Sequence, residues 1–534
     1  MRADGPGRQT ENPDPRFVFV SFTNTVTVSD AIAAAVRFPT RPLAHRSRPL
    51  VVTLGAHVAA DAQRGVMTDL RLRLRLARHL AVALFTLPFF LWPGLMLVRD
   101  LADPAMAGPG IPVRAHELHA RLSEELVPWA RERIATGRAA SAPLHDVPTT
   151  EWPMFSAVFY LMATENLVNA WESAGGEGDS PMVYARPAVD AAKDLILDPS
   201  HHTWVRTHWG DDYLHQENVF FRGLLIAGLT SYHQVTGDDE VLPMLRDQVR
   251  TLSDELDASP LGLLDDYPGE CYPIDIVATI AFIRHSDRST GFDSRAFAAR
   301  SLRAFEGERL DELGLVPFRV DLSPDRTIAS DVQPGRGIGS SWIAMFTAEA
   351  YGLERSRAWY AIHEAHFWQH QGWAEGFREW RRGSEAEWGF EIDAGPVIDG
   401  FGTAASAFGI GAARAHGRFD HAYSLSGQMA AASWTLPDGT LLLPRLVSHA
   451  ADAPYLGEAG ILYFLTVQPH EELLRSGTYV AASEVPPLAK IGVFVFFGFP
   501  ALAWWQLVRT WRRIRVGARA ASPRRPVVAR PELA

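Results

Sequence analysis

Two long uncharged stretches near the ends of the chain constrain its organisation most strongly. Residues 80–98 read LAVALFTLPFFLWPGLMLV and residues 491–508 read IGVFVFFGFPALAWWQLV. A helix of about 20 apolar residues is long enough to cross the hydrocarbon core of a bilayer. We therefore expect two membrane-spanning helices, and the alternative in each case is a helix buried in a protein core.

Arginines flank these stretches, one cluster before the first and one after the second. Basic residues next to a membrane span remain on the cytoplasmic side. We therefore expect a cell-membrane protein with both termini in the cytoplasm and its main domain outside the cytoplasm. The arginines are Arg71, Arg73, Arg75 and Arg78 before the first stretch, and Arg509, Arg512, Arg513, Arg515 and Arg519 after the second.

Composition divides the chain into five expected segments. Met67 opens MTDLRLRLRLARHLAVALF, which resembles the charged start and apolar run of a signal anchor. We expect residues 1–66 to be disordered or to precede the natural start. The other expected segments are an N-terminal anchor at 67–99, an extracytoplasmic domain at 100–487, a second span at 488–510 and a basic cytoplasmic tail at 511–534.

Charge and cysteine content exclude several functions. The net charge of −11 is concentrated between the two spans, whereas both ends of the chain are basic. An acidic domain repels phosphate backbones, so we exclude nucleic-acid binding. The single cysteine, Cys271, excludes intrachain disulfides and sites with several cysteine ligands. We expect no cofactor and no metal.

Helical periodicity dominates between the spans. Some segments, such as 216–230, 273–283, 338–350 and 402–415, are apolar on all sides, which is typical of buried helices. Charged, amphipathic segments such as 239–257 and 293–305 lie between them. This alternation predicts an all-α fold, an (α/α)6 toroid, with a solenoid or an irregular bundle as the alternative. Expected helices are 115–137, 153–174, 216–235, 239–257, 273–286, 293–305, 338–352, 354–370, 402–416 and 454–467, and a hairpin is expected at 436–447 around Asp438-Gly439.

In a toroid, the loops that enter the inner helices converge on one funnel. Four stretches of this kind combine acids, aromatics and turn glycines: 209–218, 264–275, 330–342 and 388–402. Paired carboxyl groups with separated pKa values can supply an acid and a base. The expected catalytic residues are Cys271, Asp275, Asp393 and Asp399. The expected substrate-binding residues are Tyr213, Glu217, Asp266, Glu270, Tyr272, Trp342, Trp388 and Glu391.

Each of these residues also has a structural interpretation. A lone cysteine is most often a small buried hydrophobe, although Cys271 lies two residues before Pro273 at an expected helix start. Asp275 and Asp399 suit helix caps or turns. The pair His363 and His366 has zinc-ligand spacing, but its segment is expected in the outer ring, where a packed or solvated face is the better interpretation.

One part of the sequence resembles a known family. DDYPGECYPIDIVATIAFI (265–283), after NVFFRGLLIAGLTSYHQVTGD (218–238), is similar to the linalool dehydratase/isomerase-like domain. That family carries the patterns Asn-Ile-Met-x-Ser-Gly-His and Cys-Glu-Pro-Asn with a second cysteine nine residues after the first. Asn218, Gly223, Cys271 and Pro273 match, whereas Leu224, Tyr272 and Ile280 replace the histidine, the glutamate and the second cysteine. The resemblance implies an (α/α)6 toroid that acts on a terpene alcohol without a cofactor.

The sequence thus leaves three functions open. The first is a cofactor-free lyase or isomerase of dehydratase type, acting on an alcohol or isoprenoid by acid–base chemistry. The second is a glycan-active hydrolase or lyase that uses paired carboxylates, with tryptophans as sugar platforms. The third is a non-catalytic binding or envelope-assembly module. The expected partners are a small-molecule or glycan substrate, the membrane, and possible copies of the same chain.

Overall fold

A computed structural model describes residues 53–141, 151–323, 327–384, 387–391 and 393–521 of the chain. Of the segment 1–66 that was expected to be disordered or to precede the natural start, residues 1–52 lie outside the described residues and residues 53–66 belong to helix α2 (Thr53–Thr86). The end of the basic tail, 522–534, also lies outside the described residues. The chain divides into residues 1–70 and 71–534. The second unit contains all the elements discussed below except the first part of helix α2.

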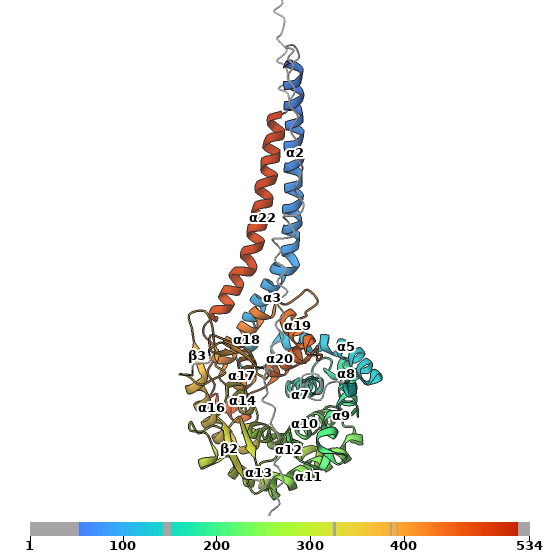
Figure 1. Cartoon of the computed structure of the whole chain (residues 1–534), viewed down its shortest axis with the longest axis vertical. Coiled ribbons are helices and arrows are strands. Elements are labelled where there is room, and N and C mark those ends of the chain that lie inside the picture. Colours follow the sequence, from blue (N-terminus) through green and yellow to red (C-terminus); the bar gives the residue numbers. More distant parts are fainter. Residues whose placement is uncertain (1–52, 142–150, 324–326, 385–386, 392, 522–534) are drawn as a thin grey trace, which may run out of the picture. The chain divides into compact units, whose positions relative to one another are not determined.

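Within the described residues, six helices form a closed inner ring (Figure 1). Each packs against the next along the chain, and the last packs against the first, which confirms the predicted toroid and excludes an open solenoid. Most apolar residues of these helices are buried, as the composition predicts. The ring consists of α7 (Trp152–Ser173), α10 (Val219–Thr236), α12 (Pro273–Thr290), α14 (Gly337–Ala344), α17 (Thr403–Ala415) and α20 (Leu456–Thr466).

A second layer of helices, several of them amphipathic, surrounds this ring. Helix α11, for example, buries Leu245, Val249, Leu252 and Leu256, which share one face at helical spacing, and exposes its charged face. The outer helices are α5 (Val113–Thr136), α8 (Met182–Leu197), α11 (Leu242–Ala258), α13 (Arg295–Ser301), α16 (Leu353–Phe367) and α18 (Phe419–Ser433). Helices α8 and α18 have no counterpart among the helices expected from the sequence.

Short elements fill the connections between the ring helices. Three small antiparallel sheets pair β1 (Arg319–Leu322) with β2 (Ile328–Gln333), β3 (Trp368–His370) with β4 (Glu375–Phe377), and β5 (Gly389–Glu391) with β6 (Gly395–Ile398) and β7 (Phe401–Gly402). The remaining helices include α4 (Pro104–Ala107), α9 (Thr203–Trp209), α15 (Thr347–Tyr351), α19 (Leu442–Ala450) and α21 (Glu471–Ser476).

Three local predictions are wrong. The predicted hairpin at 436–447 keeps its turn, where Gly439 has φ +85°, but pairs only Thr435 with Leu441 before α19 begins at Leu442. The predicted helix 338–352 is interrupted between Ala344 and Thr347. The predicted helix 354–370 ends at Phe367, because residues 368–370 pair as β3 with β4.

Two helices are long and apolar enough to cross a membrane, judged by length and composition. They cover Leu70–Leu101 and Pro487–Gly517. The first comprises the end of α2 (Thr53–Thr86), the π-helix η1 (Leu87–Leu91) and α3 (Trp92–Leu101); the second lies in α22 (Pro487–Ala521). Helices α3 and α22 contact α18 of the ring through a cluster of Leu97, Ala430, Ala431, Ala489 and Phe496.

The close contact between helices α10 and α12 at Gly223 gives a stability prediction. A Cβ at Gly223 of α10 would lie 2.3 Å from Thr279 Oγ1 of α12. Gly223→Ala should therefore lower the free energy of unfolding by about 1–3 kcal/mol, the usual cost of an overpacked core. Thermal denaturation of the purified chain measures the change.

The control for this substitution is Gly372→Ala, where a new Cβ meets no atom within 4 Å. The second variant Thr279→Ala removes the clashing hydroxyl and should restore most of the lost stability when combined with Gly223→Ala. Equal changes in the free energy of unfolding for Gly223→Ala and Gly372→Ala would contradict the close packing of α10 and α12.

Candidate active site

The N-terminal ends of the inner helices bring an acidic cluster together. Asp266 connects two of these helices, since its Oδ1 accepts from Phe220 N of α10 at 2.8 Å and its Oδ2 from the backbone N of Tyr272, the residue before α12, at 2.7 Å. Asp266 is only 2% exposed. Burial raises its pKa, as does the charge of Asp275, and the two backbone donors oppose this shift. Asp266 thus fixes the start of both helices and places a carboxyl group beside Asp275.

Asp275 is the carboxyl group best poised to donate a proton. It lies in the first turn of α12, is half-buried, and accepts a hydrogen bond from Trp342 Nε1 of α14 at 3.1 Å. Burial raises its pKa to about 7, helped by the charge of Asp393 and opposed by the Trp342 hydrogen bond. Burial raises the pKa of Asp266 well above its ordinary value despite its two backbone donors, so Asp266 stays protonated while Asp275 titrates near neutral pH.

Asp393 faces the same cluster from the segment between β5 and β6, before α17. Its side chain is exposed to solvent, yet the protein that surrounds it raises its pKa, opposed by the positive charge of Arg336. The charge of Asp393 in turn raises the pKa of both Asp275 and Glu151. Asp393 is therefore accessible to solvent, whereas the neighbouring carboxyl groups of Asp275 and Glu151 are less accessible.

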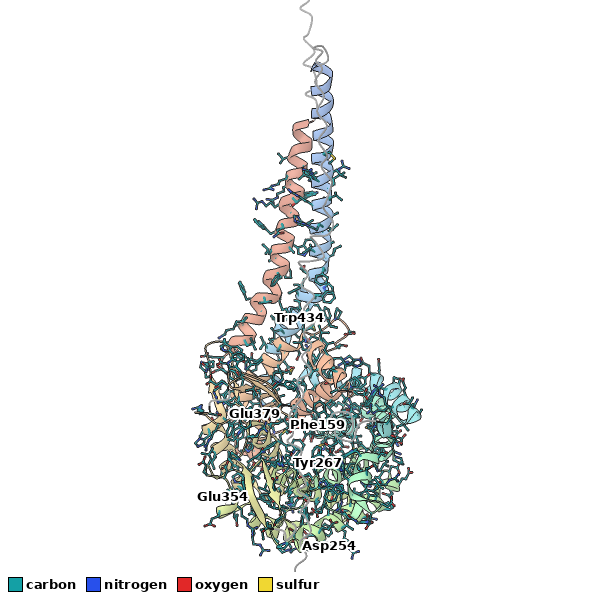
Figure 2. The ribbon with its side chains drawn as sticks, in the orientation of Figure 1. Phe159, Asp254, Tyr267, Glu354, Glu379 and Trp434 are labelled. Atoms are coloured by element: carbon teal, nitrogen blue, oxygen red, sulfur yellow. The ribbon has the colours of Figure 1, made fainter. Side chains whose placement is uncertain are left out.

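Glu151 completes the cluster from the residue before α7. It is 4% exposed, and its Oε2 accepts from the hydroxyl of Tyr267 at 2.7 Å. Burial raises its pKa to about 8. Its Oε1 has no hydrogen-bond partner within the part of the chain that the structure describes. Figure 2 shows Tyr267 and Phe159 of α7 toward the middle of the ring.

Glu151 was not among the residues predicted from the sequence. The signal was present, because Glu151 immediately precedes an apolar inner segment, in the same way as the acids before α12. Tyr267 was missed because nothing in the sequence indicates that its hydroxyl bonds to a residue more than a hundred positions away.

Aromatic rings lie beside the acids. Trp342 packs edge-on against Phe155 at 5.6 Å and against Phe408 at 5.6 Å, and Phe155 packs against Phe220 at 5.5 Å. Phe155, Phe220 and Phe408 are only half-buried, although each lies in an inner helix. Trp388, by contrast, is 70% exposed next to β5. The half-buried rings give the cluster an apolar border that can contact a sugar face or a hydrocarbon.

A fixed positive charge lies on the α14 side of the cluster. Arg336 bonds Glu379 Oε1 at 2.8 Å and also pairs with Glu391 of β5. Its guanidinium group lies between the rings of Phe318 and Trp380, 4.4 Å from each centroid. Arg336 therefore holds the β5 segment that leads to Asp393 against the ring.

Cys271 is packed into the core of the ring. Its side chain has no exposed surface, and its backbone pairs with Val320 of β1. Burial raises the pKa of the thiol well above its ordinary value, and the charges of Asp266, Asp265 and Asp275 add to this shift. The thiol therefore stays protonated, which does not suit a nucleophile. A direct chemical role for Cys271 stays a prediction.

The remaining predicted residues lie around the cluster in supporting positions. Glu270 Oε2 accepts from the hydroxyl of Tyr272 at 3.1 Å. Asp399, with φ +53°, lies in the turn between β6 and β7 and accepts from Trp373 Nε1 at 3.1 Å. It therefore has the turn role that was its alternative interpretation.

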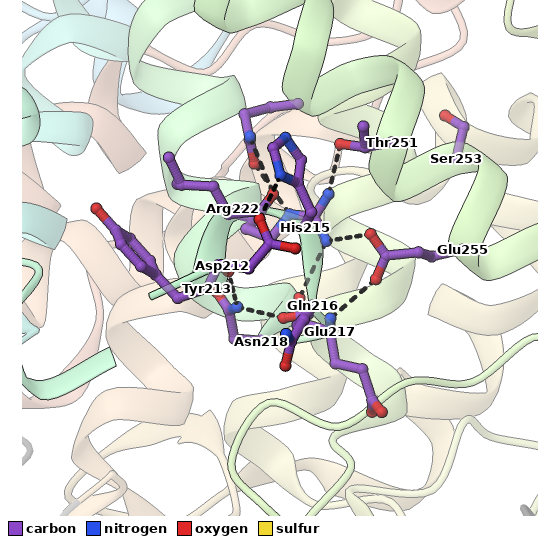
Figure 3. A network of polar contacts seen from close by, with 12 residues as sticks. Asp212, Tyr213, His215, Gln216, Glu217, Asn218, Arg222, Thr251, Ser253 and Glu255 are labelled. Carbon is purple, nitrogen blue, oxygen red and sulfur yellow. Dashed lines mark hydrogen bonds and ion pairs between the residues drawn. The ribbon is translucent and has the colours of Figure 1, made fainter. Parts of the chain in front are cut away.

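Tyr213 and Glu217 belong to the loop before α10, which Figure 3 shows with its polar network. Tyr213 bonds His202, and Glu217 Oε2 accepts from Asp265 N at 2.8 Å. Fully buried Arg222 bonds Glu255, Gln248, Thr251 and the carbonyl oxygen of Glu217. Glu217 and Asn218 have positive φ values of 37° and 38°, a strained conformation that this network maintains.

The two histidines considered as zinc ligands, His363 and His366, differ in burial. His363 is 1% exposed, bonds Ser341 Oγ at 3.0 Å and stacks on Phe377 at 4.3 Å. Burial lowers its pKa to about 3, so it remains neutral. His366, one turn on, is half-buried. Among the described residues, no group of three or more His, Cys, Asp or Glu residues is placed to hold a metal ion.

The raised pKa of Glu151 gives a pH prediction. The folded chain keeps the Glu151 proton up to about pH 8, whereas the unfolded chain loses it near the model-compound value of 4.5. Between these values the folded state binds more protons, so its stability falls as the pH rises. Glu151→Gln removes the titrating carboxyl group and therefore its contribution to this pH dependence. The stability of the variant relative to wild type should grow by up to about 1.4 kcal/mol per pH unit from pH 5 to 8.

Denaturation of both chains at several pH values measures this difference. The control is Glu354→Gln, on the exposed surface of α16, which should follow the wild-type chain at every pH. A Glu151→Gln difference that does not change with pH would contradict a buried, neutral Glu151.

Comparison with known proteins gives no family. No family model matches the chain, and no curated protein matches it. Solved structures similar to it include a family 76 glycoside hydrolase from a bovine Bacteroides thetaiotaomicron strain, with 10% identity and a TM-score of 0.32 over 58% of this chain and 68% of that one. An unsaturated glucuronyl hydrolase specific for heparin has 11% identity and a TM-score of 0.34 over 74% of this chain and 98% of that one.

A further similar structure is a family 76 glycoside hydrolase (mannosidase) from Bacteroides thetaiotaomicron VPI-5482. It has 12% identity and a TM-score of 0.32 over 61% of this chain and 88% of that one. At these values the similarity says nothing about substrate or reaction. The assignment of the (α/α)6 ring rests on the contacts between the helices of this chain.

Proposed function

We propose that the ring is a carbohydrate-active enzyme, a hydrolase or lyase that cleaves a glycan by acid–base chemistry. The observation that carries the proposal is the pairing of Asp275 with Asp393. The first has a pKa near 7, and the second is open to solvent and lies close enough for its charge to raise that pKa. Two carboxyl groups in different environments are the usual requirement for cleaving a glycosidic bond.

In hydrolysis, Asp275 gives its proton to the glycosidic oxygen as the bond from that oxygen to the sugar carbon breaks. Asp393 takes a proton from water while the water oxygen forms a bond to the same carbon. Asp266 anchors the starts of the two helices beside Asp275. Glu151, neutral below about pH 8, is a hydrogen-bonding group for a sugar hydroxyl. The half-buried aromatic rings provide surfaces for sugar faces.

A second candidate is a cofactor-free dehydratase or isomerase of an isoprenoid alcohol. The apolar border of Phe155, Phe220 and Phe408 favours it, as does the partial resemblance around Cys271. The same acid would then protonate a leaving hydroxyl group. This reaction differs from the first in its dependence on Cys271, which lies in the core.

Ligand binding separates the two candidates. In a thermal-shift screen of the full chain in detergent, we expect neutral or acidic oligosaccharides to raise the melting temperature and terpene alcohols to leave it unchanged. Stabilisation by apolar alcohols alone, lost in Cys271→Ser, would overturn the glycan proposal in favour of the second candidate.

We also propose that the two long apolar helices span a membrane, with both termini in the cytoplasm and the ring outside it. Their length, composition and flanking arginines support this topology. A green fluorescent protein fused after residue 534 should fluoresce in intact cells, and alkaline phosphatase at the same place should be inactive. The reverse pattern would contradict the proposed orientation.

A further inference from the structure

Helix α19 exposes its apolar face to solvent, whereas an outer helix such as α11 exposes its charged face. Leu443, Leu446 and Val447 are 48%, 55% and 65% exposed, and their spacing places them on one face. An amphipathic helix of a soluble domain turns such a face toward the core. The outward orientation of α19 therefore requires a cause and a covering surface.

Polar contacts on the opposite face supply the cause. Arg445 Nε bonds Glu458 Oε2 at 2.6 Å, and its Nη2 bonds Glu125 Oε2 at 2.6 Å. Glu458 has no exposed surface and also accepts from Leu441 N at 2.8 Å. Ser448 Oγ accepts from Gly457 N at 2.9 Å. These contacts hold Arg445 and Ser448 toward the domain and so fix the rotation of α19.

The first apolar span lies next to α19. The Nε1 of Trp92, at the start of α3, donates to the carbonyl oxygen of Leu436 at 3.1 Å, six residues before α19 begins. Figure 1 shows α19 beside α3 at the end of the ring from which α22 leaves. On α3, Trp92, Leu95 and Val98 are themselves exposed. The exposed face of α19 thus continues the apolar surface at the base of the span.

We propose that α19 lies on the bilayer that α3 and α22 enter, with Leu443, Leu446 and Val447 at the boundary between headgroups and acyl chains. The proposal rests on the proposed membrane topology. A bilayer is favoured over a protein partner because these three side chains offer no hydrogen bond or charge for specific recognition. Interfacial helices bury such a face roughly 5–10 Å deep. Helix α19 would thereby hold the rim of the ring against the lipid surface.

Site-directed fluorescence tests this placement in the full chain. The only cysteine, Cys271, is buried, so the wild-type chain is the unlabelled blank. Leu446→Cys carries an environment-sensitive NBD label in liposomes with quenching 5-doxyl lipids. Leu95→Cys on the first span is the positive control. Asp254→Cys, whose native side chain is 74% exposed at the end of the domain away from Trp434, is the negative control (Figure 2).

We expect the label at position 446 to shift its emission to the blue and to lose intensity comparably to position 95, with no change at position 254. Quenching at 95 but not at 446 would overturn the proposal and leave the membrane topology intact. No quenching at 95 would overturn both. A blue shift at 446 that grows with protein density, without quenching by the lipid, would overturn it in favour of a second copy of the chain.

Discussion

Asp275→Asn should lower the kcat for glycan cleavage by about 10²–10⁴-fold, the usual contribution of a general acid. The amide keeps the hydrogen-bonding shape of the carboxyl group but cannot deliver its proton. The pKa of Asp275 near 7 adds a pH signature. Activity requires the protonated form, so kcat/KM of the wild-type chain should fall as the pH rises through about 7. Steady-state kinetics from pH 4 to 9 measures both effects.

Asp399→Asn is the matched control for this substitution. The chemical change is the same, and asparagine tolerates the left-handed backbone at position 399. Asp399 lies in the turn beside Trp373, so its variant should keep wild-type kcat. Unchanged kcat in Asp275→Asn, or equal losses in both variants, would contradict the role assigned to Asp275.

Arg222→Met should lower the free energy of unfolding by about 3 kcal/mol or more, since removal of one partner from a buried ion pair costs about 3–5 kcal/mol. Arg222 has no exposed surface and bonds Glu255 Oε1 at 2.7 Å, Gln248 Oε1 at 2.9 Å and Thr251 Oγ1 at 2.7 Å (Figure 3). Because it also holds the loop before α10, the variant should lose activity together with stability. Thermal and chemical denaturation measure the loss.

Arg250→Met, on the same outer helix as Glu255, is the control. Its side chain is 79% exposed and lies 3.9 Å from the carboxylate of Asp254. An exposed pair of this kind contributes about 0–1 kcal/mol. Similar melting temperatures for the Arg222 and Arg250 variants would contradict the importance of the buried network.

The ring was predictable because the buried inner helices are rich in apolar residues and the outer helices are not. Helices such as α10 and α12 are apolar on all sides, whereas α11 carries its apolar residues on one face. Alternation of the two kinds follows from two concentric layers of helices. Helix α18 was missed because its buried residues are mainly small or polar, such as Ser424, Ser426 and Gln428, and hydrophobic periodicity does not detect these.

The site was only partly predictable for a different reason. The sequence rule was that polar groups before apolar helices face the funnel, and the structure places Asp266, Asp275 and Asp393, which that rule selected, near one another. It did not separate chemistry from turn formation, since Asp399 satisfies it equally well. Partners far apart in the sequence, such as Glu151 and Tyr267, depend on the closure of the ring. The rotation of α19 likewise depends on Glu125 and Glu458, which no local pattern connects to Arg445.

Cleavage of an oligosaccharide panel in H₂¹⁸O, followed by mass spectrometry of the products, tests the central claim most directly. The account predicts shorter saccharides, either with one ¹⁸O atom at the new reducing end from hydrolysis or with an unsaturated end from elimination. It also predicts that Asp275→Asn abolishes these products, whereas Cys271→Ser retains them. Intact saccharides together with the loss of water from an isoprenoid alcohol, blocked by Cys271→Ser, would contradict it.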